Sequence, residues 1–249
     1  MTNKGSNSPR RAIREEIQAY LTQNGEDRWK YFSASIFIHW KIMIEDFVPR
    51  FLSGRVLDDG CGYAPYSEIV CRYSKELILL DHIISHPKVN VCSDVRRLPF
   101  ENASFDCVLS LQVLEHVANP LEAIKEISRI LRPAGILLLS VPHLSRLHEL
   151  PHDYFRFTEY GLRELARCAD LEVIELVPTG GIVAFLGHQL SIAFLTGLWR
   201  IKFLRPLLLI INKLFFTKFL TTLDGLIGMS SLFPQGYAMV ARKNELAQN

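Results

Sequence analysis

The chain has 249 residues, of which 49% are hydrophobic and 22% charged, and its formal net charge is +2. This length suits one decorated domain and is short for two ordinary domains. A charge so close to neutral argues against nucleic acid as a partner. The five cysteines form no CxxC pair and no regular spacing, which excludes a disulfide framework and a cysteine zinc site. The polar N-terminus, MTNKGSNSPRR, lacks the apolar core of a secretory signal, so we expect a cytoplasmic protein with reduced thiols.

Two amphipathic helices are predicted ahead of the main domain. Apolar residues recur at helical spacing over 10–23 and again over 29–47, where an aromatic stripe includes Trp29, Trp40 and Phe47. We expect this stripe to pack against the domain rather than to line a lid over the substrate. Residues 1–53 are therefore predicted to form an N-terminal helical extension.

From residue 55 the pattern changes to short apolar runs that alternate with amphipathic segments. Such alternation predicts an α/β fold with a mostly parallel sheet and crossover helices. The predicted strands are RVLDD (55–59), ELILLD (76–81), VNVC (89–92), FDCVLSL (105–111), GILLLSV (135–141), LEVIELV (171–177) and YAMVARK (237–243).

The clearest helix follows FDCVLSL. Asn119 is the predicted N-cap, and Pro120 occupies the first helical position. Pro133 and Gly135 are expected to end the helix before the next strand. The predicted buried stripe consists of Leu121, Ile124, Ile127 and Leu131.

A glycine turn follows the first predicted strand, in VLDDGCGYAPY (56–66). Gly60 and Gly62 allow a ligand to approach the backbone with no Cβ in the way. Asp81 closes the second strand, where a carboxylate can accept both hydroxyls of a ribose. The G-x-G-x-x-G motif of a dinucleotide oxidoreductase would need a glycine at Pro65, so the spacing argues against that class.

Further motifs follow in order: SDVRRLPF, and then SFDCVLSLQVLEHVANPLEAIKEISRILRPAGILLLSVP. With these, the chain resembles the class I S-adenosylmethionine-dependent methyltransferases, in particular the group related to the ubiquinone and menaquinone C-methyltransferases. The resemblance covers residues 54–178 and the last strand. It implies a Rossmann-like, seven-stranded sheet whose last strand is antiparallel to the others.

The resemblance also implies a cofactor, S-adenosylmethionine, and residues that bind it. The methionine portion would be surrounded by Asp58, Gly60, Cys61 and Gly62. Asp81 would hold the ribose, and Asp94 would face the adenine amino group. The backbone at Leu111 and Gln112 would meet the amino-acid end of the cofactor.

Two residues depart from the family pattern. Asp59 stands where an apolar residue is usual, and Ala64 replaces the third glycine. We expect Ala64 to be tolerated through a negative φ, and Pro65 to suit the start of the following helix. A narrower resemblance, in GCG-x-x-PY and in the HxxPHDYFRFTxxGL pattern of 148–162, is to methyltransferases found among cell-envelope glycan genes.

Methyl transfer from a sulfonium is an in-line displacement, in which the enzyme mainly aligns the acceptor and excludes water. A hydroxyl acceptor also needs a general base, for which histidine is suited near neutral pH. The candidate bases near the predicted strand ends are His116, His143 and His152, with His148 in the same loop. The alternative for His116 is a structural contact in the LEH turn, and for His143 and His152 it is an anchor for the loop.

Metal-ligating residue types also gather in this loop: His143, His148, Glu149, His152 and Asp153. Their spacing matches no helical zinc motif, because Pro142 and Pro151 interrupt the segment. We therefore predict no metal site, and expect a polar loop that closes over the acceptor.

An apolar insertion of about 55 residues separates the last two predicted strands, far more than an ordinary connection. From Leu176 to Trp199 it has no formal charge, but its glycines and polar residues make it a poor transmembrane helix. Over 201–224 a helical projection predicts an apolar face of Leu207, Leu208, Ile211, Leu214, Phe215 and Phe219. The predicted polar side holds Lys202, Arg205, Asn212, Lys213, Thr217, Thr221 and Asp224.

A wide apolar face edged by cations is typical of a helix that lies in a membrane interface. The cations of the insertion are Arg200, Lys202, Arg205, Lys213 and Lys218. We therefore expect residues 182–224 to contact a membrane surface; packing on the domain or a dimer interface is the alternative. The oligomeric state is not predicted.

The sequence predicts three parts: an extension (1–53), a methyltransferase domain (54–178 and 235–243) and the insertion (179–234). We expect an enzyme at the cytoplasmic membrane face, peripheral on its inner side, that methylates a small-molecule, lipid-linked or glycan acceptor. The alternatives are a quinone-type lipid methyltransferase and a catalytically inactive membrane interaction module with the same fold.

Overall fold

A computed structural model describes residues 13, 16–17, 20–21, 30–84 and 86–245. The chain divides into two compact units. The sheet unit comprises 42–143, 147–177 and 236–249, and the helical unit comprises 1–41, 144–146 and 178–235. The described part of the predicted N-terminal extension, up to residue 41, therefore groups with the apolar insertion. Trp29 and most of the helix predicted over 10–23 lie outside the described residues.

The described helices and strands follow in chain order. They are α2 (Ala34–His39), η2 (Trp40–Phe47), α3 (Val48–Phe51), β1 (Arg55–Asp59), α4 (Ser67–Cys71), β2 (Glu76–Asp81), β3 (Val91–Cys92), β4 (Phe105–Leu111), η3 (Leu114–His116), α5 (Pro120–Ile130), β5 (Leu131–Pro142), α6 (Glu159–Cys168), β6 (Leu171–Pro178), α7 (Ile182–Leu198), η4 (Lys202–Leu204), α8 (Arg205–Ile211), η5 (Asn212–Phe219), α9 (Leu220–Ile227) and β7 (Gly236–Lys243).

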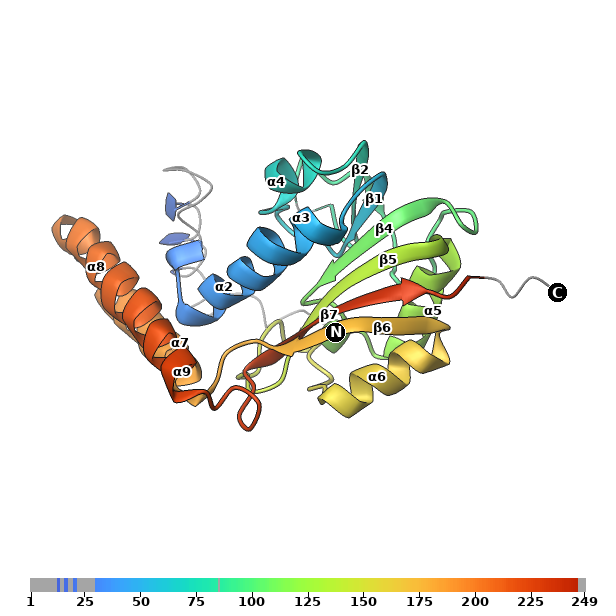
Figure 1. Ribbon diagram of the computed structural model, residues 1–249. Helices are drawn as coiled ribbons and strands as arrows, with labels where there is room; N and C mark the ends of the chain where they lie inside the picture. The colour runs from blue at the N-terminus through green and yellow to red at the C-terminus, as the bar shows by residue number, and fades with distance from the viewer. Residues whose placement is uncertain (1–12, 14–15, 18–19, 22–29, 85, 246–249) are drawn as a thin grey trace. The chain divides into compact units, whose positions relative to one another are not determined.

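The sheet unit contains a seven-stranded sheet in the order β3-β2-β1-β4-β5-β7-β6 (Figure 1). The strands β1 to β5 pair in parallel with their neighbours. The strand β7 runs antiparallel to β5, from Ile136 opposite Arg242 to Pro142 opposite Gly236. The predicted α/β class and the antiparallel last strand are thereby confirmed.

The central strands are buried on both faces because helices cover the sheet on each side. Alternate residues of a strand point to opposite faces. Val108 of β4 and Leu137 of β5 belong to one apolar cluster with residues of α5 and α6. Their neighbours Leu109 and Leu138 are equally buried. This explains why these strands are continuous apolar runs in the sequence rather than alternating ones.

The helix α5 begins as predicted. Asn119 Oδ1 accepts a hydrogen bond from the Glu122 amide (3.4 Å), and Pro120 lies in the first turn. Ile124 and Ile127 are fully buried, which confirms the centre of the predicted stripe.

The end of α5 was predicted wrongly. The helix stops at Ile130, and β5 already begins at Leu131, so Pro133 and Gly135 lie inside the strand rather than before it. The pairing with β4 explains the difference: Leu131 lies opposite Phe105, and the register resumes only at Ile136, so the residues between them bulge out of the ladder.

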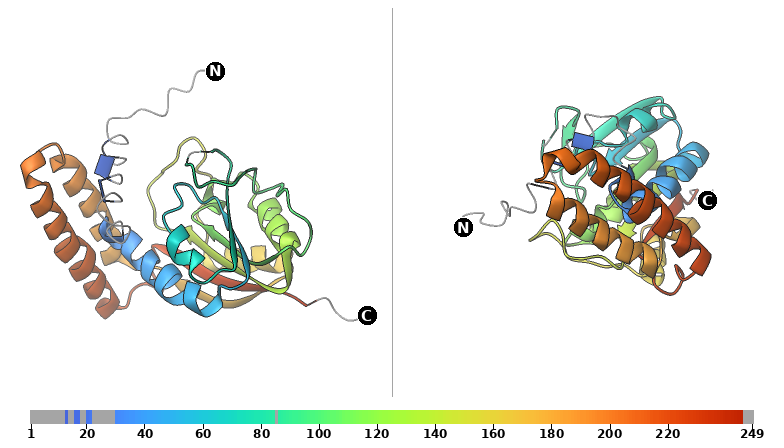
Figure 2. Two further views of the ribbon diagram at one scale, coloured as in Figure 1. Left: turned by 90° about the horizontal axis from the view of Figure 1, so that it is seen from above. Right: turned by 90° about the vertical axis from the view of Figure 1, so that its left-hand side faces the viewer.

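The helical unit places two apolar helices side by side. The segments η4, α8, η5 and α9 form one continuous helix, Lys202–Ile227, which we call the long helix. It runs antiparallel to α7 along its length (Figures 1 and 2). Among the described residues, this helix is long and apolar enough to cross a membrane by length and composition, and only 17% of its most apolar window is buried.

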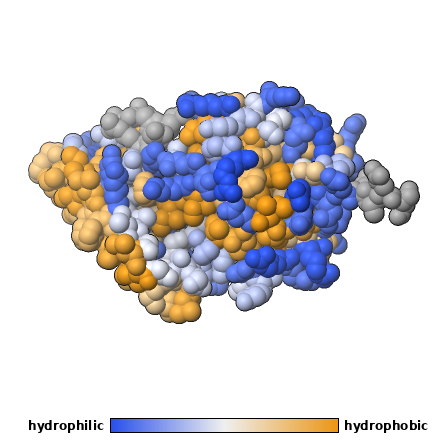
Figure 3. Space-filling view, in the orientation of Figure 1, coloured by the Kyte–Doolittle hydropathy of each residue, from blue (hydrophilic) through white to orange (hydrophobic). Residues whose placement is uncertain are grey.

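The long helix buries its polar residues and exposes its apolar ones. Asn212 is 1% exposed and Thr217 is 0% exposed. The apolar residues on the other side are about half exposed or more: Leu207, Ile210, Leu214, Phe219 and Leu226. Figure 3 shows hydrophobic residues gathered over α8 and its continuation. This arrangement is the reverse of a helix that packs on a soluble core.

Hydrogen bonds within the helical unit explain why polar side chains face inward. The Asn212 amide donates to the carbonyls of Tyr31 (2.8 Å) and Phe32 (3.1 Å). Ser191 Oγ, on α7, lies 2.7 Å from Asn212 Oδ1. Thr217 Oγ1 donates to the Tyr31 carbonyl (3.2 Å). The predicted separation of polar and apolar residues onto two sides of the helix is present, and the buried polar residues Asn212, Thr217 and Asp224 face inward.

Two of the predicted cations also have partners inside this unit. Lys213 Nζ lies 4.4 Å from the centre of the Tyr31 ring. The Arg205 guanidinium lies over the Trp199 ring at 4.6 Å and forms an ion pair with Glu16 (2.8 Å). Both cations therefore have partners within the helical unit, through cation–π contacts and an ion pair.

Asp224 joins the ends of the two helices. Its buried carboxylate accepts hydrogen bonds from the amides of Gly181 (2.6 Å), Val183 (3.0 Å) and Ala184 (3.1 Å) at the start of α7. An acidic side chain at this position satisfies amides that have no partner within the helix and complements the helix dipole. Gly228 then ends α9 in the left-handed conformation (φ 69°).

We predict that Asp224→Ala loosens this junction, because it leaves three amides in a buried place without an acceptor. The expected loss of unfolding free energy is about 3 kcal/mol. Hydrogen exchange read by mass spectrometry should show faster exchange at 181–184. Thr222→Ala, on an exposed face of the same helix, is the control. Equal exchange in both variants would contradict the capping role.

Candidate active site

The carboxyl ends of four parallel strands meet at one edge of the sheet. Asp59 of β1 lies opposite Leu80 of β2 and Ser110 of β4. The strand order reverses direction between β1 and β4, and ligands of open α/β sheets bind outside the carboxyl ends at such a point. The segments that follow β1, β2, β3 and β4 at this edge contain the predicted cofactor residues.

The glycine turn after β1 is held by backbone hydrogen bonds to β2. The amides of Gly60 and Cys61 both donate to the Leu80 carbonyl (2.9 and 3.0 Å). Gly60 has φ +71°, and a Cβ there would come within 2.5 Å of Val113 Cγ2. Gly62 has φ +54°, and a Cβ there would meet nothing within 4 Å. The two glycines therefore have different roles: one allows close packing, and the other borders open space.

Asp81 ties this turn to the end of β2. Its Oδ2 accepts from the Gly62 amide (2.8 Å), and its Oδ1 accepts from the Ile83 amide (3.2 Å) and lies 2.8 Å from His82 Nδ1. A carboxylate has about four lone-pair sites, so Asp81 retains capacity for a ligand hydroxyl. Its position agrees with the predicted ribose contact.

Ala64 does not have the backbone conformation that we predicted. Its φ is +51°, in the left-handed region, rather than negative. The methyl group is buried beside Cys61 and Leu79, and the Ala64 amide closes a turn to the Cys61 carbonyl (2.8 Å). Burial of the methyl group offsets a left-handed strain of about 1–2 kcal/mol. Pro65 was also misplaced, because α4 begins only at Ser67.

Cys61 contributes its backbone to the turn, while its side chain packs inward. Burial, followed by the charge of Asp58, raises the pKa of the Cys61 thiol to about 12. Since the thiolate is the reactive form, Cys61 is chemically inert at neutral pH.

Two adjacent aspartates at the end of β1 are buried with little compensation. Burial, reinforced by the charge of Asp81, raises the pKa of Asp58 to about 7. Burial, and then the charge of Asp58, raises the pKa of Asp59 well above its usual value. Neither oxygen of Asp59 has a hydrogen-bond partner among the described residues. Burial thus favours the neutral form of Asp59, and that form is the one suited to a position where an apolar residue is usual.

The remaining predicted cofactor residues lie at the same edge. Asp94 follows β3; it is exposed and pairs with Arg96 (2.6 Å), whose hydrogen bond lowers the Asp94 pKa. Leu111 ends β4, and Gln112 has φ +60°. The Gln112 amide donates to the Ser140 carbonyl (2.9 Å). The structure thus places all of these residues on strand ends that can share one ligand.

The three predicted bases make different contacts. His143 Nδ1 lies 2.8 Å from the Phe157 carbonyl, and His152 Nδ1 lies 2.9 Å from the Tyr154 hydroxyl. His116 Nδ1 lies 2.6 Å from the His152 carbonyl. A carbonyl can only accept, so Nδ1 of His143 and of His116 holds a proton. Each of these two rings is anchored through Nδ1, and its Nε2 is the atom that remains for chemistry.

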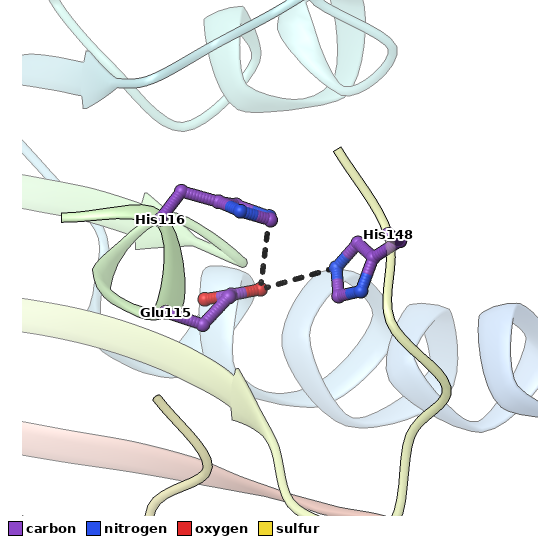
Figure 4. A group of neighbouring side chains, drawn as sticks. All are labelled: Glu115, His116 and His148. Atoms are coloured by element: carbon purple, nitrogen blue, oxygen red, sulfur yellow. Dashed lines mark ion pairs between the residues drawn. The ribbon is translucent and has the colours of Figure 1, made fainter. Parts of the chain in front are cut away.

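A buried glutamate beside these histidines was not among the predicted site residues. Glu115 is 0% exposed, and its carboxylate lies 3.7 Å from His116 Nε2 and 3.8 Å from His148 Nε2 (Figure 4). His148 Nδ1 in turn faces Asp153, which Arg156 holds at 2.6 Å. The signal was present in the sequence, since an acidic residue four positions after a buried strand and next to a histidine is unusual for packing alone.

Comparison with known proteins identifies the domain that this edge belongs to. Residues 57–139 match the family model of a methyltransferase domain. A Mycobacterium tuberculosis protein named as a probable S-adenosylmethionine-dependent methyltransferase is 29% identical over 112 residues, 41% of each chain. The malonyl-acyl-carrier-protein O-methyltransferase of Herminiimonas arsenicoxydans is 31% identical over 51% of each chain. The chain thus spans about half or less of the length of these curated relatives.

Solved structures show the same fold at lower identity. The 4+2 cyclase SpnF matches with a TM-score of 0.58 and 18% identity over 82% of each chain. A Burkholderia thailandensis N1-methyltransferase with bound S-adenosylhomocysteine matches with a TM-score of 0.54 and 17% identity, over 98% of this chain and 94% of that one. Because one neighbour is named a cyclase, the fold alone does not fix the reaction.

The chain contains a class I S-adenosylmethionine-dependent methyltransferase domain, as the order of its motifs predicted. S-adenosylmethionine is the cofactor of this class, and the two glycines, Asp58 and Asp81 fit it. The open space at Gly62 and the remaining acceptor site of Asp81 suit a nucleoside with a free ribose hydroxyl. The individual contacts stay predictions.

We predict that Asp81→Ala weakens S-adenosylmethionine binding by about 10- to 100-fold, the equivalent of one charged hydrogen-bonding partner. Isothermal titration calorimetry measures this directly. Asp94→Ala is the control, because the Asp94 carboxylate is exposed and already paired; a smaller loss is expected there. Thermal melting without cofactor checks that both variants fold. Unchanged affinity in a folded Asp81→Ala variant would contradict the ribose assignment.

We predict that Asp59→Leu stabilises the sheet unit and changes its pH dependence. Unfolded Asp59 ionises near pH 4, and burial raises the pKa of the folded residue well above this, so the unfolding free energy falls as the pH rises above 4. For one titrating group, the unfolding free energy changes by at most about 1.4 kcal/mol per pH unit. The gain over wild type should therefore be larger at pH 8 than at pH 5. Asp59→Asn, which cannot ionise, should share the pH dependence of the leucine variant. If the unfolding free energy of both variants depends on pH as that of wild type does, Asp59 does not have a raised pKa.

Proposed function

We propose that the protein is an S-adenosylmethionine-dependent methyltransferase that acts on a lipid-borne acceptor at the cytoplasmic face of a membrane. The methyltransferase domain supports the chemistry. The observation that supports the location is the polarity of the helical unit, with polar residues inside and apolar residues outside.

The physical reason is the cost of exposing apolar surface to water. Each large apolar side chain stabilises the fold by about 1.5–3 kcal/mol when it leaves water, and the long helix leaves many exposed. Lipid chains would cover them at no such cost, while Asn212, Ser191 and Thr217 satisfy one another and the backbone inside. A contiguous apolar surface of this kind is typical of a membrane or protein contact.

A lipid-borne acceptor follows from placing the enzyme at a membrane. The narrower sequence resemblance to methyltransferases of cell-envelope glycan genes favours a lipid-linked glycan intermediate. A quinone-type lipid is the second candidate, because an Arabidopsis thaliana ubiquinone biosynthesis O-methyltransferase is 32% identical over 101 residues. That relative is matched over only 31% of its length, so the likeness is confined to the shared domain.

A catalytically inactive membrane module is less well supported. Its basis was the two departures at Asp59 and Ala64. Asp59 is buried, which raises its pKa, and the Ala64 methyl packs beside Leu79 rather than into the open space at Gly62. Neither residue obstructs the turn.

Transfer of a radiolabelled methyl group from S-adenosylmethionine tests the proposed activity. The full chain is incubated with a total lipid extract and with the water-soluble fraction of the same cells. Label that enters the organic phase is expected. Label confined to water-soluble products would contradict a lipid-borne acceptor. If calorimetric titration with S-adenosylmethionine releases or absorbs no heat, the inactive module is favoured.

We predict that the full chain floats with vesicles that contain anionic lipid. Leu207→Glu together with Leu214→Glu places two charges on the exposed apolar face, at about 2.5–3.5 kcal/mol each within hydrocarbon. This variant should stay at the bottom of the gradient. The control is Tyr73→Glu with Tyr160→Glu, two exposed aromatic residues of the sheet unit. Wild type that is recovered only in the soluble fraction would refute the membrane contact.

A further inference from the structure

A cluster of three side chains in the sheet unit has the geometry of an empty cation site. Glu115 and His116 come from the turn η3 after β4, and His148 comes from the loop after β5 (Figure 4). Their ligand atoms, one from each residue, all lie within 4.8 Å of one another. Figure 4 shows both imidazole rings directed at the Glu115 carboxylate, and both Nε2 atoms face its Oε1 atom.

The Glu115 carboxylate is the second observation that points to a ligand. It is fully buried, and neither oxygen has a hydrogen-bond partner among the described residues. A buried carboxylate without hydrogen bonds is strongly unfavourable unless a cation compensates it. The nearest groups, at 3.7 and 3.8 Å, are too far for hydrogen bonds and leave room for an ion between them.

The outer contacts of the histidines determine what their inner nitrogen atoms present. His116 Nδ1 must donate to the His152 carbonyl (2.6 Å), so the neutral ring directs a lone pair from Nε2 toward Glu115. His148 Nδ1 faces Asp153 Oδ2 at 3.6 Å. Metal-binding histidines are commonly oriented by a hydrogen bond from Nδ1 to a carbonyl or a carboxylate, with Nε2 left for the metal, and His116 has this arrangement.

The nearby Arg156 guanidinium interacts electrostatically with Glu115. It is held by Asp153 at 2.6 Å, however, and the Glu115 oxygens have no hydrogen-bond partner among the described residues. A divalent cation between the three side chains would accept a lone pair from each of their ligand atoms.

We propose that Glu115, His116 and His148 bind one divalent transition-metal ion. Two imidazole nitrogen atoms and one carboxylate oxygen suit zinc or ferrous iron, and three protein ligands leave a coordination position open. The site lies close to the glycine turn, because Val113, two residues before Glu115, faces Gly60. This proposal revises the sequence-based expectation of no metal.

The open coordination position would take an oxygen of the methyl acceptor. This part of the proposal rests on the proposed function. A metal-bound hydroxyl loses its proton more readily, and here the proton passes to solvent. The acceptor oxygen then forms a bond to the methyl carbon while the carbon–sulfur bond breaks. The electron pair of that bond stays on sulfur, and S-adenosylhomocysteine leaves.

Metal content of the full chain tests the site without reference to activity. The protein is stripped with a chelator, incubated with Zn²⁺, desalted and measured by elemental mass spectrometry. About one zinc ion per chain is expected in wild type and in the control His86→Ala, whose ring lies beside Tyr63 rather than in the cluster. Glu115→Gln and His148→Ala should retain no zinc above background. Zinc retained equally by all four proteins, or by none, would overturn the proposal.

Two further readouts separate metal binding from a structural role of the cluster. Cobalt substituted at the site should give visible absorption bands in wild type that Glu115→Gln lacks, although both proteins fold by circular dichroism. Asp153→Asn, which removes the carboxylate that faces His148 Nδ1 and pairs with Arg156, should weaken zinc binding by about 10-fold. Absent cobalt bands in wild type would overturn the site even if S-adenosylmethionine binds, and would leave the proposed function standing.

Discussion

The hydrogen bond from the Gly62 amide to Asp81 is the contact on which the cofactor edge depends. It joins the turn after β1 to the end of β2, and the two amides that donate to Leu80 fix the same turn from beneath. The backbone at Gly62 then borders open space rather than side chains. Without this tie, a left-handed turn between two strand ends would be free to close over the place where the nucleoside is expected.

Buried acidic groups give this edge its electrostatic character. Burial raises the pKa of Asp58 to about 7 and the pKa of Asp59 well above its usual value, and the Glu115 carboxylate lacks any hydrogen-bonding partner among the described residues. Such groups lower stability and persist where a ligand compensates them. A cationic sulfonium would compensate Asp58, and a divalent ion would compensate Glu115. In the helical unit, by contrast, the buried side chains of Asn212, Thr217 and Asp224 are hydrogen-bonded, and apolar side chains are exposed.

The sequence was sufficient where local pattern and fold agree. The strands β1, β2 and β4 were predicted to the residue, because buried parallel strands are uninterrupted apolar runs. Predictions from local sequence pattern were insufficient where contacts between distant segments determine the secondary structure or the side that a residue faces. Leu131 joined a strand because of Phe105, and Asn212 turned inward because the carbonyls of Tyr31 and Phe32 need donors.

The site was predicted in part for the same reason. Family motifs locate the cofactor residues, since these follow strands at fixed positions. The cluster of Glu115, His116 and His148 could not be recognised by spacing, because a turn and a distant loop contribute to it. The backbone conformation of Ala64 could not be predicted either. A left-handed φ is unusual for alanine, and the contact of its methyl group with Leu79 is visible only in the folded structure.

The most direct test of the account is a crystal structure of the full chain soaked with S-adenosylhomocysteine. The nucleoside is expected over the carboxyl ends of β1 and β2, with a ribose hydroxyl on Asp81 and the backbone of Gly62 against the ligand. A turn that stays vacant at saturating ligand, or a nucleoside bound elsewhere on the chain, would contradict it.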